Sequence, residues 1–440
     1  MPRDENDDDD ARPTGETRTM FARVFSIASA NACVAALGFV GNGVLLPRAL
    51  DEAAFAATSL FLAAFQWGQE IMGRSLNWAL LRISPAAEQQ RSGGSDATIA
   101  GAWSLQLRLV GTGIAIALLA AASLRMFLDA DGAPSRAAML ALAGVAAAIG
   151  VVFWFDLGRL QLRERFHAMS ACMAANSALR VCAWAMLWAI GALSLESAIA
   201  AHLATGALAA LLARKQAGPM PPLLDHARSA EERTRLWSFS GRMILATALA
   251  STAAQVDLFL LDAQSDDAAT GRLRIAVMFG IALELATSAL MTALLPQAGR
   301  AATAEQVRAM LRRARAAGLA IAALAACSVP VVQWALPILL PRYADAADLY
   351  GIVCIGVAVT AATDPLGLSF VSRDKPGRFV LLSAVMLAIV VLGNLFAPGD
   401  DRANVTAWTR TAGRIALGAG ILFFVLRDVR SDRQKAAAAC

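Results

Sequence analysis

The chain has 440 residues, of which 58% are hydrophobic and only 17% are charged, with a formal net charge of +5. Soluble domains carry about 25% charged residues, so this composition excludes an ordinary soluble protein and favours an integral membrane protein. Lys and Arg lie in short segments between apolar runs. The basic balance therefore indicates membrane topology, and we expect no nucleic-acid partner.

Residues 1–19 form an acidic segment punctuated by Pro and Gly, which predicts a disordered tail. It lacks the basic start of a cleavable signal peptide, so the first apolar run is expected to remain as a helix. About twelve apolar segments follow, each long enough to cross a hydrocarbon core of roughly 30 Å, and lipid permits only helices there. They are 20–46, 53–81, 100–123, 137–158, 167–190, 194–214, 237–263, 270–298, 315–340, 346–372, 376–397 and 405–426.

Lys and Arg concentrate in alternate loops, which predicts that both termini are cytoplasmic. The preference for Arg over Lys in an Ala-rich chain is typical of GC-rich bacteria, so we expect the inner membrane. The longest inner loop, 215–236, is predicted to link two six-helix halves, 20–214 and 237–426, with a cytoplasmic tail at 427–440. The expected fold class is an all-α polytopic membrane protein with its two halves around a central cavity, as in many transporters.

Several kinds of chemistry are missing from the sequence. There is no Walker-type phosphate loop, no G-x-S-x-G or H-E-x-x-H motif, and no loop long enough for a catalytic domain. The three His residues show no ligand spacing with Cys or carboxylates. We therefore expect a protein that is not an enzyme and that needs no cofactor or metal.

Polar residues inside the predicted spans are costly and mark candidate functional positions. Gln66, Glu70, Arg74 and Asn77 follow helical spacing on the second helix and share one face. The stripe predicts a cavity wall, although a helix–helix contact with an internal Glu70–Arg74 pair is compatible with the same pattern.

Other predicted helices also carry deep cations, and guanidinium groups bind phosphate oxygens in a bidentate way. These cations predict a cavity for an anionic substrate with a phosphate or diphosphate group. The candidates are Arg180 with Asn176, Arg410 with Arg414, and the first-turn residues Arg23 and Arg242. For Arg23 and Arg242, snorkelling of the side chain to the membrane surface explains the position equally well.

Glu70, Glu284 and Asp257 are among the acids that fall within predicted spans. A buried carboxylate can bind a proton or Na⁺, or it can neutralise a neighbouring Arg. We therefore treat the three as candidates for ion coupling.

Several stretches resemble polysaccharide and O-antigen flippases (Wzx-like) of the multidrug/oligosaccharidyl-lipid/polysaccharide (MOP) exporter superfamily. The first and seventh helices with their partners, at 26–82 and 237–300, carry the resemblance. Within the second stretch, Val256-Asp257-Leu258-Phe259-Leu260-Leu261 precedes an acidic turn and a long helix that ends in Leu295-Pro296. The turns at 335–350 and 368–378 are similar as well.

The resemblance implies export of an undecaprenyl-diphosphate-linked oligosaccharide from the cytoplasmic to the periplasmic leaflet by rocking of the two halves. It also implies the lipid bilayer as surroundings, with a polysaccharide polymerase and glycosyltransferases as further partners. The alternative is a cation-coupled multidrug exporter of the same superfamily, although its expected acid-dominated cavity disagrees with the deep Arg residues. Three other candidates fit less well. A sugar transporter of the major facilitator type usually has a different loop after its second helix, a membrane enzyme of the same pathway needs a large periplasmic loop, and a structural scaffold does not explain the buried charges.

Overall fold

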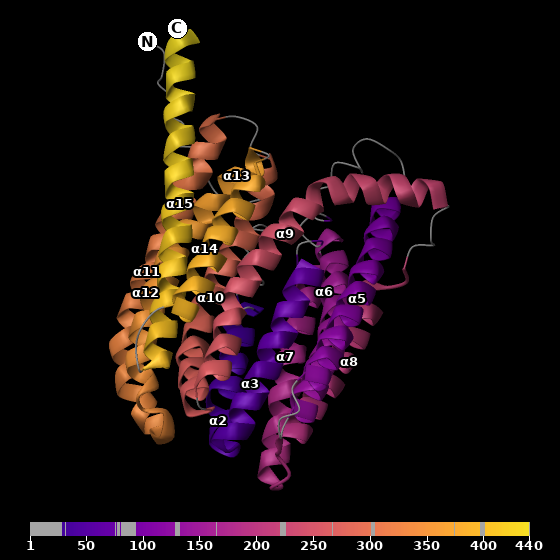
Figure 1. The fold of residues 1–440 in the computed structure, drawn as a ribbon. Helices are drawn as coiled ribbons and strands as arrows, with labels where there is room; N and C mark the ends of the chain where they lie inside the picture. Colours follow the sequence, from indigo (N-terminus) through magenta and orange to yellow (C-terminus); the bar gives the residue numbers. More distant parts are fainter. Residues whose placement is uncertain are drawn as a thin grey trace, which may run out of the picture.

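The computed structural model is helical throughout the ranges that it describes, and it has no β-strand within them (Figure 1). The described residues are 29–30, 32–74, 76, 80, 94–127, 133–163, 165–220, 226–265, 267–300, 304–373, 375–396 and 401–439. The predicted all-α membrane fold of about twelve long helices is confirmed.

The first helix is described from Ala32 and includes the π-helical turn η1 (Phe39–Leu45) and α2 (Leu46–Ala49). A second π-helical turn, η2 (Glu70–Arg74), directly follows α3 (Glu52–Gln69) in the second helix. The later helices are α5 (Gly94–Phe127), α6 (Ala133–Leu162), α7 (Phe166–Ala189), α8 (Leu195–Ala217), α9 (His226–Gln264), α10 (Asp267–Arg300), α11 (Ala304–Leu339), α12 (Ala346–Thr363), α13 (Leu368–Ser372), α14 (Gly377–Phe396) and α15 (Arg402–Ala439). Short 3₁₀ turns, η3 (Pro341–Tyr343) and η4 (Asp364–Gly367), precede α12 and α13.

Eight helices in the described chain are long and apolar enough to cross a membrane. Four long helices, α3, α7, α10 and α15, do not meet that standard of length and apolarity. These four carry most of the polar residues of the cavities described below. A helix that faces a cavity can carry such residues because it is shielded from lipid on that side.

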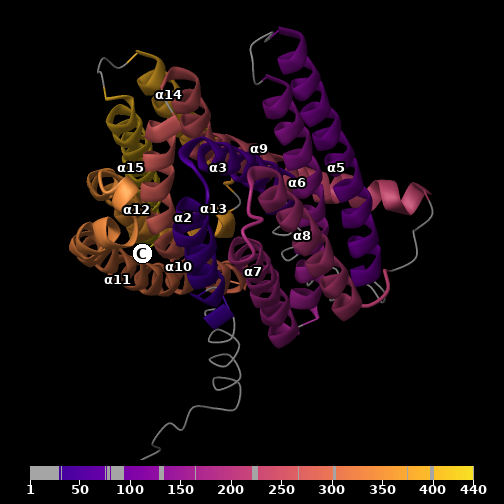
Figure 2. The same ribbon diagram turned by 90° about the horizontal axis from the view of Figure 1, so that it is seen from below.

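The helices α5 to α8 lie on one side of the bundle, and α11, α12, α14 and α15 lie on the other (Figure 1). Seen from below, α2 and α10 lie between these two groups (Figure 2). The helix α9 packs against α5 near its beginning and against α14 further along. The largest apolar core includes Trp184 of α7, Leu273 of α10 and Tyr350 of α12, so it joins the two sides.

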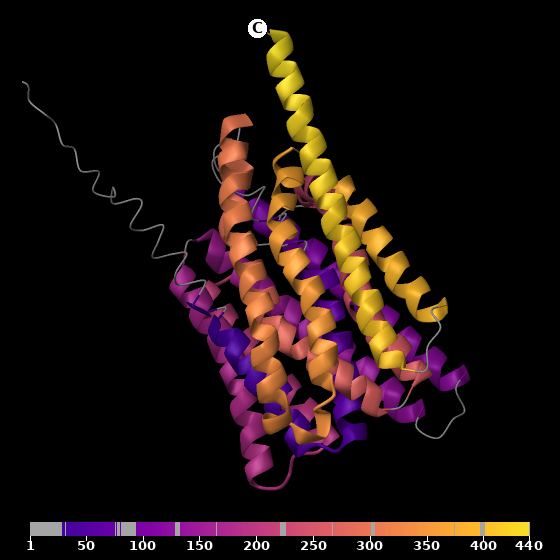
Figure 3. The same cartoon turned by 90° about the vertical axis from the view of Figure 1, so that its left-hand side faces the viewer.

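Several helices extend beyond the predicted apolar segments. The helix α9 begins at His226, so the second part of the predicted 215–236 linker is helical. The helix α15 continues to Ala439 and projects beyond its neighbours (Figure 3), although its apolar segment was predicted to end at 426. Hydropathy marks only the apolar middle of a helix, whereas Ala, Arg, Glu and Lys continue it readily into water. The division into two halves at 215–236 stays a prediction.

A buried ion cluster joins α6 to the end of α8. Asp156 accepts hydrogen bonds from Arg159 at 2.8 Å and from Arg214 at 2.6 Å, and the side chains of Asp156 and Arg159 are fully buried. Arg159 also donates to the carbonyl of Pro219 at 2.6 Å, just beyond the last turn of α8. Arginine donors satisfy the unpaired carbonyls at a helix end, so this cluster fixes the position of α8.

A second ion cluster lies beyond the predicted span 405–426, where Asp428 of α15 meets the start of α14. Arg378 donates two hydrogen bonds to the Asp428 carboxylate, at 2.7 and 3.0 Å, and Lys375 and Arg373 lie 3.5 and 3.8 Å from it. Burial raises the pKa of Asp428, but the Arg378 hydrogen bonds and the three positive charges outweigh burial, so the pKa lies below its ordinary value.

The lowered pKa predicts a pH-dependent contribution of Asp428 to stability. A carboxylate with a depressed folded-state pKa stabilises the fold above its unfolded pKa, about 3.9, and this contribution is lost as the pH falls further. Asp428→Asn should therefore lower the thermal midpoint of the detergent-solubilised protein by a few degrees at pH 7, and this gap should narrow below about pH 4. Asp348→Asn, an exposed position on α12, is the matched control. A gap that is constant with pH would contradict the prediction.

Candidate functional site: two adjoining cavities

Two cavities lie inside the bundle. The α15 cavity, about 360 Å³, is lined by α9, α10, α12, α14, α15 and η4, with the end of α3 on one side. The α7 cavity, about 410 Å³, is enclosed by the first helix, α3, α6, α7 and α10. Both are within the size range of small-molecule sites. They adjoin at a shared wall formed by Gln66, Glu70, Arg274, Ile281, Glu284 and Ser288.

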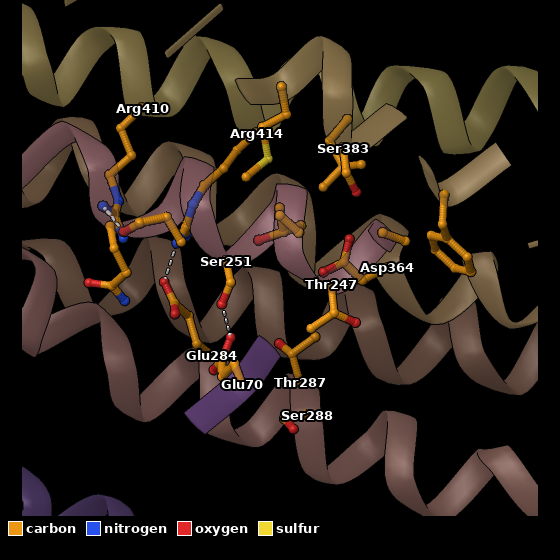
Figure 4. Close-up of a pocket in the computed structure, with 18 of the residues that line it drawn as sticks. Glu70, Thr247, Ser251, Glu284, Thr287, Ser288, Asp364, Ser383, Arg410 and Arg414 are labelled. Atoms are coloured by element: carbon orange, nitrogen blue, oxygen red, sulfur yellow. Dashed lines mark hydrogen bonds and ion pairs between the residues drawn. The ribbon is translucent and has the colours of Figure 1, made fainter. Parts of the chain in front are cut away.

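Buried salt bridges hold the two arginines of α15. Arg410 lies 2.6 Å from the carboxylate of Asp257, which is fully buried, and donates to the carbonyl of Ala254 at 2.8 Å. Arg414 lies 2.5 Å from Glu284 of α10 (Figure 4). The arginine stripe that the sequence places on one face of this helix is therefore paired with acids from α9 and α10.

Acids and bases are balanced around the α15 cavity. Figure 4 shows Glu70 and Asp364 facing the same space, and Ser251 of α9 donates to Glu70 at 2.7 Å. Among the described residues that line this cavity, three arginines are accompanied by three carboxylates. Most of the positive charge that the sequence places here is thus already neutralised by the protein.

Arg180 of α7 has different surroundings. Within the described chain, no acid lies within salt-bridge distance of it, and its Nε has no hydrogen-bond partner. Its neighbours around the α7 cavity include the neutral amides of Asn42, Gln69, Gln161 and Asn176. Arg180 is therefore a cation available to a ligand, on the side of the cavity that offers amide donors and acceptors, opposite the shared wall with its charged residues Glu70, Arg274 and Glu284.

The sequence did not identify Arg274 as a site residue, because it was placed near the outer end of the eighth helix. The helix α10 begins at Asp267, which puts Arg274 about two turns inside it. Its side chain is 4% exposed, lines both cavities, and has no salt bridge within the described ranges. The acidic residue Asp267 could have indicated this earlier helix start, since acids are frequent in the first turn of a helix.

Local backbone geometry sets the orientation of two further cavity residues. Asn42 lies in the π-helical turn η1 and Glu70 begins the π-helical turn η2. Such turns rotate the side chains that follow them and are frequent at functional sites. A β-carbon on Gly41 would lie 3.0 Å from Val181 and 3.2 Å from Trp184, so glycine lets the first helix approach α7 closely.

The structure assigns positions to most of the predicted site residues. Gln66, Glu70 and Glu284 lie in the shared wall, Arg410 and Arg414 line the α15 cavity, and Arg180 and Asn176 line the α7 cavity. Asp257 lies behind Arg410, whereas Arg242 is exposed on α9 and lines neither cavity. Arg23, Asn77 and the Arg74 side chain lie outside the described residues. Residues that the sequence did not identify are Asn42, Gln255, Arg274, Thr287 and Ser288.

The described residues contain no group of three or more His, Cys, Asp and Glu side chains arranged to hold a metal ion. The chemistry of both cavities is that of binding: ion pairs, amides and hydroxyl groups on an apolar background. Such a lining orients a ligand by hydrogen bonds and charge.

No protein-family model matches the chain, and no curated protein matches it. Among solved structures, an inward-facing MATE family multidrug resistance transporter of the MOP superfamily is 14% identical, with a TM-score of 0.67, 94% of this chain and 99% of that chain covered. A mutant of the Vibrio cholerae MATE transporter VcmN is 16% identical, with a TM-score of 0.64 and coverages of 94% and 97%. The lipid II flippase MurJ in an inward closed conformation is 9% identical, with a TM-score of 0.63 and coverages of 93% and 87%. The chain therefore has the fold of these MOP-type transporters.

Proposed function

We propose that this protein is a flippase that moves a lipid-diphosphate-linked oligosaccharide from the cytoplasmic to the periplasmic leaflet of a bacterial inner membrane, for the synthesis of a surface polysaccharide. The observation that carries the proposal is the unpaired Arg180 among the amides of the α7 cavity. A guanidinium group binds a diphosphate through several charge-assisted hydrogen bonds, and amides suit the hydroxyl and acetamido groups of sugars.

The shared wall between the cavities supports alternating access as the mechanism. Glu70 at the end of α3 accepts from Ser251 of α9, and the indole of Trp67 donates to Thr252 at 3.0 Å. These hydrogen bonds join the segment that carries Gln66 and Glu70 of the shared wall to α9, which packs against helices of both sides of the bundle. Breaking and reforming a few such contacts is sufficient to let two rigid groups of helices rock against one another.

A cation-coupled multidrug exporter is the second candidate. The observation in its favour is the set of three carboxylates, Glu70, Glu284 and Asp364, around the α15 cavity, of which Glu70 and Glu284 also line the α7 cavity. Carboxylates bind cations, so this cavity suits a cationic compound or a coupling ion better than a diphosphate. Both functions would use the same fold.

The test reconstitutes the full chain in proteoliposomes with a fluorescent undecaprenyl-diphosphate-linked N-acetylglucosamine. We expect wild-type protein to move this probe across the bilayer. Arg180→Ala should weaken its binding by about tenfold to a hundredfold, because a charged hydrogen bond is worth about 1.5–3 kcal/mol. Arg312 is an exposed position on α11, and Arg312→Ala is the matched control. It should change neither the binding of the probe nor its movement across the bilayer.

The same vesicles separate the two candidates when they are loaded with a cationic dye. Dye extrusion driven by an ion gradient, without movement of the diphosphate lipid, would overturn the flippase proposal in favour of the exporter. Equal probe binding by wild type and Arg180→Ala would remove the observation on which the proposal depends.

A further inference from the structure

A third and much smaller cavity, about 20 Å³, lies behind Arg180 between α3, α6, α7 and α8. It shares Phe65, Gln69, Asn176 and Arg180 with the α7 cavity. On the far side it is lined by His202 of α8, whose side chain is only 2% exposed. A buried histidine thus lies directly behind the one arginine that we assign to the substrate.

Aromatic rings hold the His202 imidazole. Phe61 and Phe65 of α3 meet it edge-on, with ring centroids 5.4 and 4.6 Å away, and Trp184 of α7 stacks on it at 6.3 Å. The Trp184 indole is itself fixed by a 3.0 Å hydrogen bond to the carbonyl of Ala198. The imidazole therefore has a fixed orientation, although no hydrogen bond from a described residue reaches its Nδ1.

Three unpartnered polar atoms belong to residues that line this small cavity: His202 Nδ1, Arg180 Nε and Asn176 Oδ1. Burial of a polar group without a hydrogen bond is costly, and such groups in folded proteins are normally satisfied. Asn176 Oδ1 is an acceptor, Arg180 Nε–H is a donor, and His202 Nδ1 is an acceptor when the imidazole proton lies on Nε2. One water molecule can donate to both acceptors and accept from the donor.

The volume of the cavity matches this chemistry. A buried water needs about 10–15 Å³ of accessible volume and two to four polar partners, and the cavity offers both. We propose that a water molecule in this cavity links His202 to Arg180 and Asn176, and that His202 is a positioning residue for Arg180. The link holds the Nε edge of the guanidinium, so that its remaining N–H groups are presented to the α7 cavity.

The role of this link in substrate binding rests on the proposed function, because it assumes that Arg180 binds an anionic headgroup. The link itself does not depend on that assumption. It predicts that the effects of substituting His202 and Arg180 on stability are coupled even without ligand, because both side chains form hydrogen bonds to the same water.

The experiment is a double-mutant cycle with His202→Leu, Arg180→Ala and the double variant, all in the full chain purified in detergent. The first readout is binding of undecaprenyl diphosphate. We expect His202→Leu to weaken binding about fivefold when Arg180 is present and to have no further effect when Arg180 is alanine. The second readout is the thermal midpoint without ligand, for which the two single substitutions should not be additive.

Two further variants separate positioning from simple packing. His202→Asn places an amide oxygen near the position of Nδ1 and should restore most of the binding that His202→Leu loses. Thr205→Val, on the same buried face of α8, removes a 2.7 Å hydrogen bond to Ala201 and serves as the control for core damage. It should lower the midpoint without changing the affinity for undecaprenyl diphosphate.

The outcomes distinguish the two proposals. The positioning role of His202 would be overturned if the shifts in thermal midpoint of the two single variants were additive. It would also be overturned if His202→Leu weakened binding equally with arginine and with alanine at position 180. If wild-type protein does not bind undecaprenyl diphosphate, the proposed function fails, while the midpoint cycle still decides whether the two residues are linked. Coupling of the midpoints in that case would retain the water link and reassign it to another ligand.

Discussion

Replacing Arg410 by methionine is expected to destabilise the fold so strongly that little folded protein can be purified. Asp257 is fully buried, and besides Arg410 its carboxylate accepts only the N–H of Leu258, at 2.8 Å, among the hydrogen bonds within the described chain. Arg410→Met would leave that carboxylate buried beside a thioether. Breaking a buried ion pair in this way costs about 3–5 kcal/mol, a large fraction of the stability of most proteins.

The measurement is the yield of monodisperse protein in detergent and its thermal midpoint. A double variant, Asp257→Leu with Arg410→Met, removes both charges and should recover much of the lost stability, because replacing a whole buried pair by apolar residues is often neutral. Arg312→Met on exposed α11 controls for the loss of one positive charge. A single Arg410→Met variant as stable as wild type would show that the pair contributes nothing.

Gly318→Ala is expected to have the second largest effect, through the packing of α11 against α12. A β-carbon at this position would lie 2.5 Å from the carbonyl oxygen of Ala361 and 3.3 Å from the α-carbon of Ala362. Both are backbone atoms, so no side-chain rotation relieves the clash and the two helices must separate. Small residues let membrane helices approach closely, and overpacking costs about 1–3 kcal/mol, occasionally more.

The matched control is Gly111→Ala on α5, where an added β-carbon meets no atom within 4 Å. Alanine favours a helix over glycine by about 1 kcal/mol, so this variant should be as stable as wild type or slightly more stable. Both variants are compared by thermal unfolding in the same detergent. Equal midpoints for the two would mean that α11 and α12 are not packed as closely as the structure shows.

The helices were predictable from the sequence because their cause is local. An apolar run of about 20 residues in lipid has no alternative to a helix, since each backbone N–H and C=O must be satisfied within the segment. The ends were less predictable, as α9 and α15 show. Their polar extensions are helical through propensity and packing, which hydropathy does not measure.

The site was predictable only in part. Helical periodicity placed Arg410 and Arg414 on one face, and it identified Glu284 and Asp257 as unusual acids. It could not show that each arginine is paired with one of these acids, because the partners are separated by 130 and 153 positions in the chain. The contrast between these neutralised arginines and the unpaired Arg180 favours the α7 cavity as the diphosphate site.

The sequence by itself determined that this protein is a membrane-embedded bundle of long helices with polar stripes on a few of them. The tertiary structure alone decided which stripes face a cavity, which charges cancel, and that Arg274 and His202 belong to the interior. The physical reason is that helix formation and membrane burial depend on neighbours in the chain. The pairing of charges depends instead on how the helices pack together, which is set by contacts distributed over the whole bundle.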